Sequence, residues 1–248
     1  MKKKFECKRD NLLIRGNEYR KKEGKLPVLI LSHGYLANQK MCAKYAKLAS
    51  KLGYAAFTFD FNGGGLLSKS SGKSIDMTVL SEVEDLKAVI QYIKKREDID
   101  EKNISLLGCS QGGVVSAIVA KQYPNIHSLI LLYPAFCIPD DARLGKMMFA
   151  HFDPDRIPSI IQHFPMKLSR QYASCVQKWQ ISDMAGNYDG PVLYLQGTKD
   201  QVVKLHYARE AQRLYSNIKY YEIDGGGHMF RGKYDSIAQG IIKEFLDM

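Results

Sequence analysis

The chain has 248 residues, of which 45% are hydrophobic and 25% are charged. These values are typical of a globular domain and exclude a disordered, collagen-like or coiled-coil protein. No apolar run approaches the roughly 18 residues that a membrane span needs, and the basic N-terminus lacks the apolar stretch of a secretion signal.

The positive charge is concentrated at the start of the chain. The net charge of +10 comes from 36 Lys and Arg against 26 Asp and Glu, and residues 1–25 alone hold ten basic and four acidic residues. No nucleic-acid-binding motif accompanies them, so we interpret the charge as the solvated surface of an N-terminal hairpin and predict no nucleic-acid partner. A basic protein that associates with nucleic acid while keeping the same fold is the alternative from a different class.

The cysteine content points to a reducing compartment. Five cysteines, an odd number without a C-x-x-C pair, argue against a disulfide framework and favour free thiols. Together with the missing signal segment this predicts a cytoplasmic protein. No spacing of Cys and His resembles a zinc site and no glycine-rich run resembles a phosphate-binding loop, so we predict neither a metal nor a cofactor.

Strands and helices alternate along most of the chain. Two short strands are predicted at 5–7 and 12–20, with Gly16 interrupting the second. Residues 27–31 form a continuous apolar run, which is typical of a strand buried on both faces of a parallel sheet. Further strands are predicted at 54–59, 104–107, 129–132, 191–195 and 219–223. Helices are predicted at 41–52, 79–93, 114–120, 204–215 and 234–246. This order predicts an α/β fold with a mostly parallel central sheet flanked by helices.

One segment interrupts the alternation. Residues 134–190 hold five of the eight prolines and the single Trp, with helix fragments around 168–180 and no clear strand. An insertion of this length in an α/β fold is typically a functional lid. We therefore predict a core made of residues 1–133 and 191–248 and a lid subdomain at 134–190.

The sharpest chemical signal is Gly108-Cys109-Ser110-Gln111-Gly112, a G-x-S-x-G motif between a predicted strand and a predicted helix. A serine on such a turn projects its hydroxyl outward, and glycines two residues away on either side remove side chains that would collide there. The N-terminus of the following helix provides free N–H groups. We predict that Ser110 is a nucleophile, and that Cys109 packs beneath the turn instead of reacting itself.

A nucleophilic serine needs a base and an orienting carboxylate. His228 follows three glycines in a loop between a strand and the last helix, and Asp200 follows the predicted strand 191–195 at the same edge of the sheet. The order Ser110, Asp200, His228 is that of α/β hydrolases. Asp224 is the rival carboxylate. The other histidines are predicted to be structural or on the surface: His33, His127, His151, His163 and His206.

The oxyanion of an acyl-transfer intermediate needs two N–H donors. One is predicted to be the backbone N–H of Gln111, at the start of the helix that follows the serine. The other is predicted to be the N–H of Tyr35, in the loop Ser32-His33-Gly34-Tyr35 after the first buried strand. His33 is then expected to orient that loop.

Several of these segments together resemble bacterial α/β-hydrolase esterases of the cinnamoyl (feruloyl) esterase type. The resemblance covers nearly the whole chain and includes residues 31–35, 60–65, 77–85, 110–115 and 197–200 and the His228 loop. It implies a Ser110–His228–Asp200 triad, an oxyanion hole at Tyr35 and Gln111, and a lid that holds an aromatic acyl group. By similarity to the family, Asp141 is the acceptor for a phenolic hydroxyl; a solvated aspartate in a turn is the alternative.

The sequence therefore predicts a cofactor-independent serine carboxylesterase whose partner is a small ester, with an aromatic acyl group preferred. Short-chain or monoacylglycerol esterases, thioesterases and serine peptidases share the triad and stay open as alternatives. A homodimer is compatible with the sequence.

Overall fold

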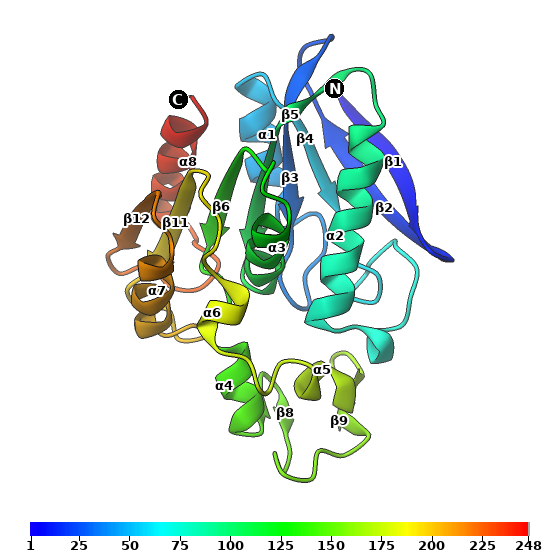
Figure 1. Cartoon of the computed structure of the whole chain (residues 1–248), viewed down its shortest axis with the longest axis vertical. Coiled ribbons are helices and arrows are strands. Elements are labelled where there is room, and N and C mark those ends of the chain that lie inside the picture. Colours follow the sequence, from blue (N-terminus) through cyan, green and yellow to red (C-terminus); the bar gives the residue numbers. More distant parts are fainter. Residues whose placement is uncertain (248) are drawn as a thin grey trace.

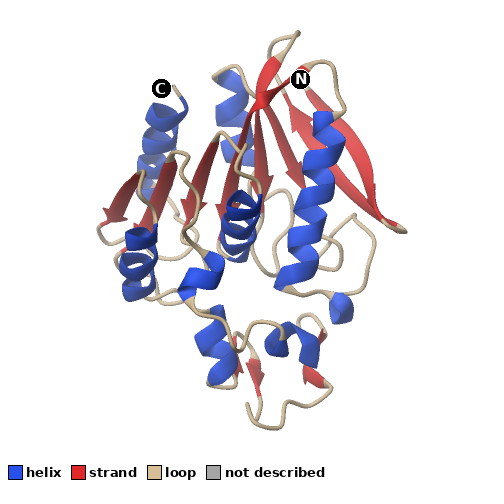
Figure 2. Cartoon of the chain, in the orientation of Figure 1, coloured by secondary structure: helices blue, strands red, loops and turns tan. Residues whose placement is uncertain are grey.

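The computed structural model describes residues 1–247. An eight-stranded sheet crosses the molecule with helices on both faces (Figure 1; Figure 2). The first three strands across it are antiparallel neighbours and the rest pair in parallel. The predicted α/β class with a mostly parallel sheet is therefore confirmed. In sheet order the strands are β1 (Lys2–Arg9), β2 (Leu12–Tyr19), β4 (Ala55–Phe59), β3 (Leu26–Ser32), β5 (Ile99–Cys109), β6 (Ser128–Leu132), β11 (Val192–Gly197) and β12 (Ile218–Ile223).

Alternate side chains of the central strands enter two separate cores. On β3, Val28 and Ile30 belong to one cluster, whereas Leu29 and Leu31 belong to the other. All four are fully buried, which explains the continuous apolar run in the sequence. The first cluster is covered by α2 (Val79–Lys94), α3 (Gln111–Gln122) and α7 (Leu205–Ala211), and the second by α1 (Ala43–Lys51) and α8 (Lys233–Leu246) (Figure 1).

The N-terminus of α2 is defined by a capping box. The Thr78 hydroxyl accepts a hydrogen bond from the Ser81 N–H at 3.0 Å, and the Ser81 hydroxyl accepts one from the Thr78 N–H at 2.8 Å. Two N–H groups without partners inside the helix are thereby satisfied. The first turn of α2, which also contains Glu82, is consequently fixed in place.

Strand β2 is continuous, so the expectation that Gly16 interrupts it is wrong. Gly16 pairs with Phe5 on one side and with Phe59 on the other. A Cβ at Gly16 would lie 2.3 Å from the Phe5 ring and 2.4 Å from the Thr58 carbonyl oxygen. The glycine is therefore required by close packing inside the sheet.

Residues 134–190, which we call the lid, connect β6 to β11. The segment from α4 to α6 lies at the carboxyl ends of the parallel strands, and the chain then returns to the start of β11 (Figure 1). The sequence shows no clear strand in this segment, but two small antiparallel hairpins form there. Their strands have two or three residues, and one pairing contains a register shift, so no alternating pattern develops in the sequence. The lid elements are α4 (Ile138–Arg143), β7 (Lys146–Met147), β8 (Ala150–His151), β9 (Ile160–Gln162), β10 (Leu168–Ser169), α5 (Arg170–Ser174) and α6 (Ile181–Met184).

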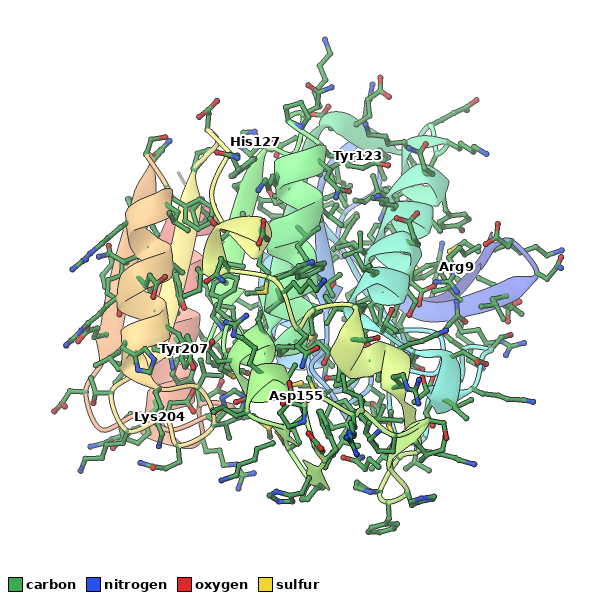
Figure 3. All side chains as sticks on the ribbon, turned by 60° about the horizontal axis from the view of Figure 1, so that its bottom comes forward. Arg9, Tyr123, His127, Asp155, Lys204 and Tyr207 are labelled. Atoms are coloured by element: carbon green, nitrogen blue, oxygen red, sulfur yellow. The ribbon has the colours of Figure 1, made fainter. Side chains whose placement is uncertain are left out.

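Hydrogen bonds attach the lid to the core and to itself. Tyr207 of α7, labelled in Figure 3, donates to Asp140 of α4 at 2.8 Å. Arg143 donates to the carbonyl oxygens of Gln177 and Trp179 at 2.8 and 2.7 Å, which ties α4 to the segment after α5. The start of the lid is thus attached to the core, and its later part is attached to that start. Over residues 1–247, no helix is both long and apolar enough to cross a membrane.

Candidate active site

Ser110 lies on the sharp turn between β5 and α3. Its backbone φ of 53° and ψ of −122° fall in a region that non-glycine residues rarely adopt. A Cβ at Gly108 would lie 2.2 Å from the Gly112 oxygen, and one at Gly112 would lie 2.4 Å from the His33 oxygen. The glycines of the motif therefore allow β5, α3 and the loop after β3 to approach closely enough for this turn.

The structure brings Ser110, His228 and Asp200 together. Ser110 Oγ lies 3.1 Å from His228 Nε2, and His228 Nδ1 lies 2.8 Å from Asp200 Oδ2. Asp224 instead accepts a hydrogen bond from Thr198 at the surface. Among the two candidate carboxylates, only Asp200 has the geometry to orient the imidazole.

Asp200 is held as a buried, ionised carboxylate. Its Oδ1 accepts the N–H groups of Val202 and Val203 at 2.8 and 2.9 Å, and its Oδ2 accepts Gln196 Nε2 at 3.0 Å in addition to His228. Burial alone raises the pKa of Asp200, but the hydrogen bond and charge of His228 and the two N–H groups outweigh it and hold the pKa below its usual value. The carboxylate can therefore stabilise an imidazolium at His228.

His33 is fully buried and fixes the loop that follows β3. Its Nδ1 lies 2.8 Å from the Gly34 carbonyl oxygen, and its Nε2 accepts the Phe61 N–H at 3.1 Å. Burial lowers the pKa of His33, which agrees with a neutral ring that donates at one nitrogen and accepts at the other. His127 precedes β6 at the amino ends of the strands, away from the lid (Figure 3).

The two predicted oxyanion donors flank the serine. Gly34 lies so close to Ser110 that a Cβ on it would be 3.0 Å from Ser110 Cβ, which places the Tyr35 loop against the turn. Gln111 is the first residue of α3. Within residues 1–247, neither the Tyr35 nor the Gln111 backbone N–H donates to another protein atom. Both are available to a ligand.

Asp141, the predicted phenol acceptor, lies on α4 of the lid. It is half-buried and takes a hydrogen bond from the Cys137 thiol. Burial, reinforced by the neighbouring Asp140, raises the pKa of Asp141 to about 6. Within residues 1–247 its carboxylate makes no hydrogen bond to Ser110, His228 or Asp200, so a role for Asp141 in substrate binding stays a prediction.

Cys109 packs beneath the nucleophile turn. It is fully buried, and its thiol contacts that of Cys42. Contact with Cys109 and burial raise the pKa of the Cys42 thiol well above its ordinary value. All five cysteines are free, and in residues 1–247 no group of His, Cys, Asp and Glu has the arrangement of a metal site.

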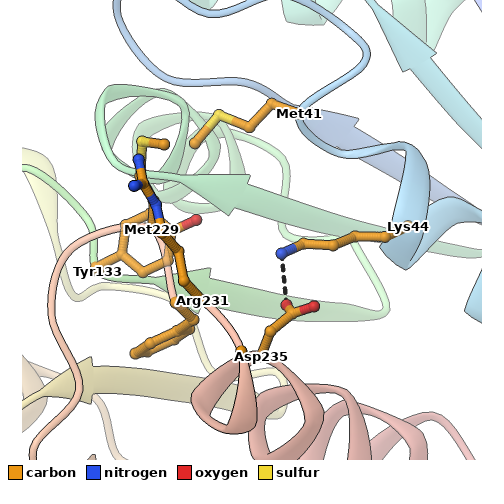
Figure 4. Close-up of a pocket in the computed structure, with 8 residues that line it drawn as sticks. Met41, Lys44, Tyr133, Met229, Arg231 and Asp235 are labelled. Carbon is orange, nitrogen blue, oxygen red and sulfur yellow. Dashed lines mark ion pairs between the residues drawn. The ribbon is translucent and has the colours of Figure 1, made fainter.

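A cavity of about 380 Å³ lies beside the histidine loop (Figure 4). Tyr133 forms part of its wall and contacts the His228 ring with 4.7 Å between ring centroids. Lys44 and Asp235 form an ion pair of 2.5 Å there. Arg231 also lines the cavity and has no ion pair within residues 1–247. Two cations and one carboxylate give the lining of the cavity a net positive charge.

Sequence reasoning missed Glu82, Gln162 and Tyr172, which hydrogen-bond to the side chains of Gln111 and Tyr35. No motif marks these three residues. The stretch 77–85, which carries part of the resemblance to feruloyl esterases, contains Glu82 and was the available signal for it.

A family profile described as "Serine aminopeptidase, S33" matches residues 25–178, and one described as "alpha/beta hydrolase fold" matches residues 153–230. The chain belongs to the α/β-hydrolase family. Among curated proteins, this hydrolase is 24% identical over 206 residues to the mouse "alpha/beta hydrolase domain-containing protein 17C". The matched residues are 81% of this chain and 53% of the mouse protein. An uncharacterized 31.7 kDa Escherichia coli protein is 33% identical over 98 residues, 38% of this chain and 33% of that protein. The chain spans between a third and about half of these relatives.

Solved structures match the hydrolase over almost its full length. Est1E from Butyrivibrio proteoclasticus, in a structure with ferulic acid bound, superposes with a TM-score of 0.89 at 27% identity, covering 98% of this chain and 97% of Est1E. DcsB, in complex with its substrate analogue, superposes with a TM-score of 0.81 at 22% identity, covering 99% and 98%. The second likeness is one of fold alone.

Proposed function

We propose that the protein is a serine carboxylesterase that hydrolyses small esters and prefers hydroxycinnamate (feruloyl or cinnamoyl) esters. The observation that carries the proposal is the continuous line of hydrogen bonds from Asp200 through His228 to Ser110, which stands on a strained turn beside two free N–H groups. Similarity to Est1E, whose structure holds ferulic acid, supports the aromatic acyl group.

In the acylation half-reaction, Ser110 Oγ attacks the ester carbonyl carbon while His228 Nε2 takes its proton. The carbonyl oxygen becomes an oxyanion that accepts hydrogen bonds from the N–H groups of Tyr35 and Gln111. The carbon–oxygen bond to the alcohol then breaks, and His228 gives its proton to the departing oxygen. Asp200 stabilises the imidazolium throughout.

In the deacylation half-reaction, His228 takes a proton from water, and the resulting hydroxide attacks the acyl-enzyme carbonyl. The same two N–H groups stabilise the second oxyanion. Collapse of this intermediate breaks the bond to Ser110 Oγ, which regains a proton from His228, and the carboxylic acid leaves. One water is consumed and one acid and one alcohol are released.

The two halves of the ester are proposed to lie on opposite sides of Ser110. Because His228 must protonate the leaving oxygen, the alcohol departs on the histidine side, next to the cavity of Figure 4. Lys44 is paired with Asp235, so the charge of Arg231 in that cavity is what favours an alcohol that carries an anionic group. The acyl group then faces the lid, where the Tyr35 and Tyr172 rings lie 5.9 Å apart between centroids.

The test is a panel of 4-nitrophenyl and methyl esters with feruloyl, cinnamoyl, acetyl and medium-chain acyl groups, together with an acyl thioester and an aminoacyl anilide. We expect the highest kcat/KM for a feruloyl or cinnamoyl ester and labelling of Ser110 by a fluorophosphonate, with both activity and labelling lost in Ser110→Ala. Faster hydrolysis of the thioester or the anilide, or activity retained in Ser110→Ala, would overturn the proposal.

A further inference from the structure

The side chains of both candidate oxyanion residues are hydrogen-bonded to the lid. Tyr172 of α5 donates its hydroxyl to Gln111 Oε1 at 2.5 Å. Gln162 of β9 donates its Nε2 to the Tyr35 hydroxyl at 2.6 Å and also to the Met166 carbonyl oxygen at 2.8 Å. The lid therefore holds both residues whose N–H groups flank Ser110. Its contact with Gln111 spans 61 residues of sequence, and its contact with Tyr35 spans 127.

The other end of the Gln111 side chain is held by the core. Gln111 Nε2 donates to Glu82 Oε2 of α2 at 2.8 Å, so the amide is bonded at both its oxygen and its nitrogen. Glu82 is 1% exposed and forms no ion pair with a Lys or Arg in residues 1–247. Its Oε1 faces Gly64, where an added Cβ would lie 2.5 Å from that oxygen. Glu82 therefore lies between Gln111 and the backbone of Gly64, where only a glycine fits.

Burial disfavours the ionised form of Glu82. Burial raises the pKa of its carboxyl well above the ordinary value, and the nearby Asp85 raises it further, whereas the hydrogen bond from Gln111 opposes them. A buried carboxyl without a cation is costly to ionise. The contact that Glu82 makes in this site is the hydrogen bond from Gln111, and not an ion pair.

We propose that Tyr172 and Glu82 are positioning residues that hold Gln111, and with it the backbone N–H at the start of α3, in the geometry that stabilises the oxyanion. The proposal rests on the esterase function proposed above. Because the contact from Tyr172 comes from the lid, the oxyanion hole is complete only when the lid lies in the position seen here. A lid that binds the acyl group is thereby coupled to transition-state stabilisation at Ser110.

If Tyr172 and Glu82 hold the oxyanion donor, their replacement should affect kcat and KM differently. An oxyanion donor acts on the transition state more than on the bound ester, so its displacement lowers kcat and leaves KM nearly unchanged. Removing one such donor entirely costs about 10²- to 10³-fold in kcat. Loosening the residue that bears it should cost less, about 10- to 50-fold.

The experiment uses Tyr172→Phe, which removes one hydroxyl and keeps the ring, and the pair Glu82→Gln and Glu82→Leu. With 4-nitrophenyl acetate, whose acyl group is too small to fill the lid, we expect Tyr172→Phe and Glu82→Leu to lower kcat about 10-fold or more, with KM within about twofold. Glu82→Gln keeps a carbonyl oxygen for Gln111 Nε2 and should retain at least about a third of the kcat. The double variant Tyr172→Phe/Glu82→Leu should lose little beyond the larger single loss.

The matched control is Tyr188→Phe, another buried tyrosine, whose hydroxyl donates to the Ile126 carbonyl oxygen at 2.9 Å, away from Gln111. It should keep the wild-type kcat. A boronic acid that forms a tetrahedral adduct with Ser110 gives a second readout, because its dissociation constant should rise in Tyr172→Phe by the same factor as kcat/KM falls.

Unchanged kcat in Tyr172→Phe, a loss confined to KM, or a Glu82→Gln variant as slow as Glu82→Leu would each overturn the inference. Tyr172→Phe decides the question even if Glu82→Leu does not fold. Failure of the esterase function gives a different result: wild type would then hydrolyse no ester in the panel, whereas failure of this inference leaves the wild type active and Tyr172→Phe equally active.

Discussion

Replacing Asp200 by Asn would keep the shape of the side chain and reverse its hydrogen bond with His228. The Val202 and Val203 N–H groups both donate to Asp200 Oδ1, so the amide oxygen of Asn must occupy that position. The amide NH₂ then takes the place of Oδ2 and donates to His228 Nδ1. The imidazole is left with its proton on Nε2, the atom that has to accept the proton of Ser110.

The loss should be large because water cannot repair it. Asp200 is only 4% exposed, and the two N–H groups hold the amide in the unfavourable orientation. Only the rare correct tautomer of His228 would remain productive, so we expect kcat to fall by about 10³- to 10⁴-fold. That corresponds to about 4 to 5.5 kcal/mol in the activation free energy.

The assay is steady-state hydrolysis of 4-nitrophenyl acetate near neutral pH, with thermal unfolding measured in parallel. The control is Asp224→Asn, whose carboxylate meets Thr198 at the surface and should leave kcat within about twofold. If Asp200→Asn keeps more than a tenth of the wild-type kcat, or if Asp224→Asn falls as far, the reasoning from the tautomer of His228 is refuted.

Three further outcomes are expected. Asp141→Ala should lower kcat/KM for caffeoyl or feruloyl esters by about 10-fold or more relative to cinnamoyl esters, which lack the hydroxyl, and should barely affect acetyl esters. If the ratio of kcat/KM for feruloyl and cinnamoyl esters is unchanged, Asp141 does not bind the phenolic hydroxyl. Arg231→Gln should lower kcat/KM about three- to tenfold for esters of an alcohol bearing a carboxylate, with neutral alcohols and high salt as controls. An equal loss for charged and neutral alcohols would show that the cavity does not bind the alcohol. Thiol alkylation of the native protein should leave turnover intact because Cys109 is fully buried, and inactivation that is faster than unfolding would contradict this.

The order of the main elements could be predicted because their patterns are long. The run at 27–31 and the helical spacing over 79–93 correspond to β3 (Leu26–Ser32) and α2 (Val79–Lys94) with small differences at the ends. Burial on both faces of a sheet imposes a continuous apolar run, and burial on one face of a helix imposes a 3.6-residue period. The turn at Ser110 could be anticipated for the same reason, since its steric demand requires glycines at fixed spacing.

The lid and the Gln111 contacts could not be predicted in this way. Strands of two residues are too short to show a period, and Gly16 was misjudged because the contact that requires it, the Phe5 ring, lies on the neighbouring strand. Tyr172 meets Gln111 across 61 positions of sequence. No local pattern records a pairing that only the folded chain brings together.

The lid has two proposed roles, which depend on different residues: Tyr172 holds Gln111, and another part of the lid binds the acyl group. The Tyr172 hydroxyl has to reach Gln111, and its place is fixed because α5 follows β10 directly and α4 is tied to the core through Asp140 and Tyr207. The proposed acyl-binding wall with Asp141 makes no comparable hydrogen bond to Ser110, His228 or Asp200 within residues 1–247. Substitutions in that wall can therefore alter which acyl group is bound while the oxyanion geometry persists, whereas changes that displace α5 should slow every ester alike.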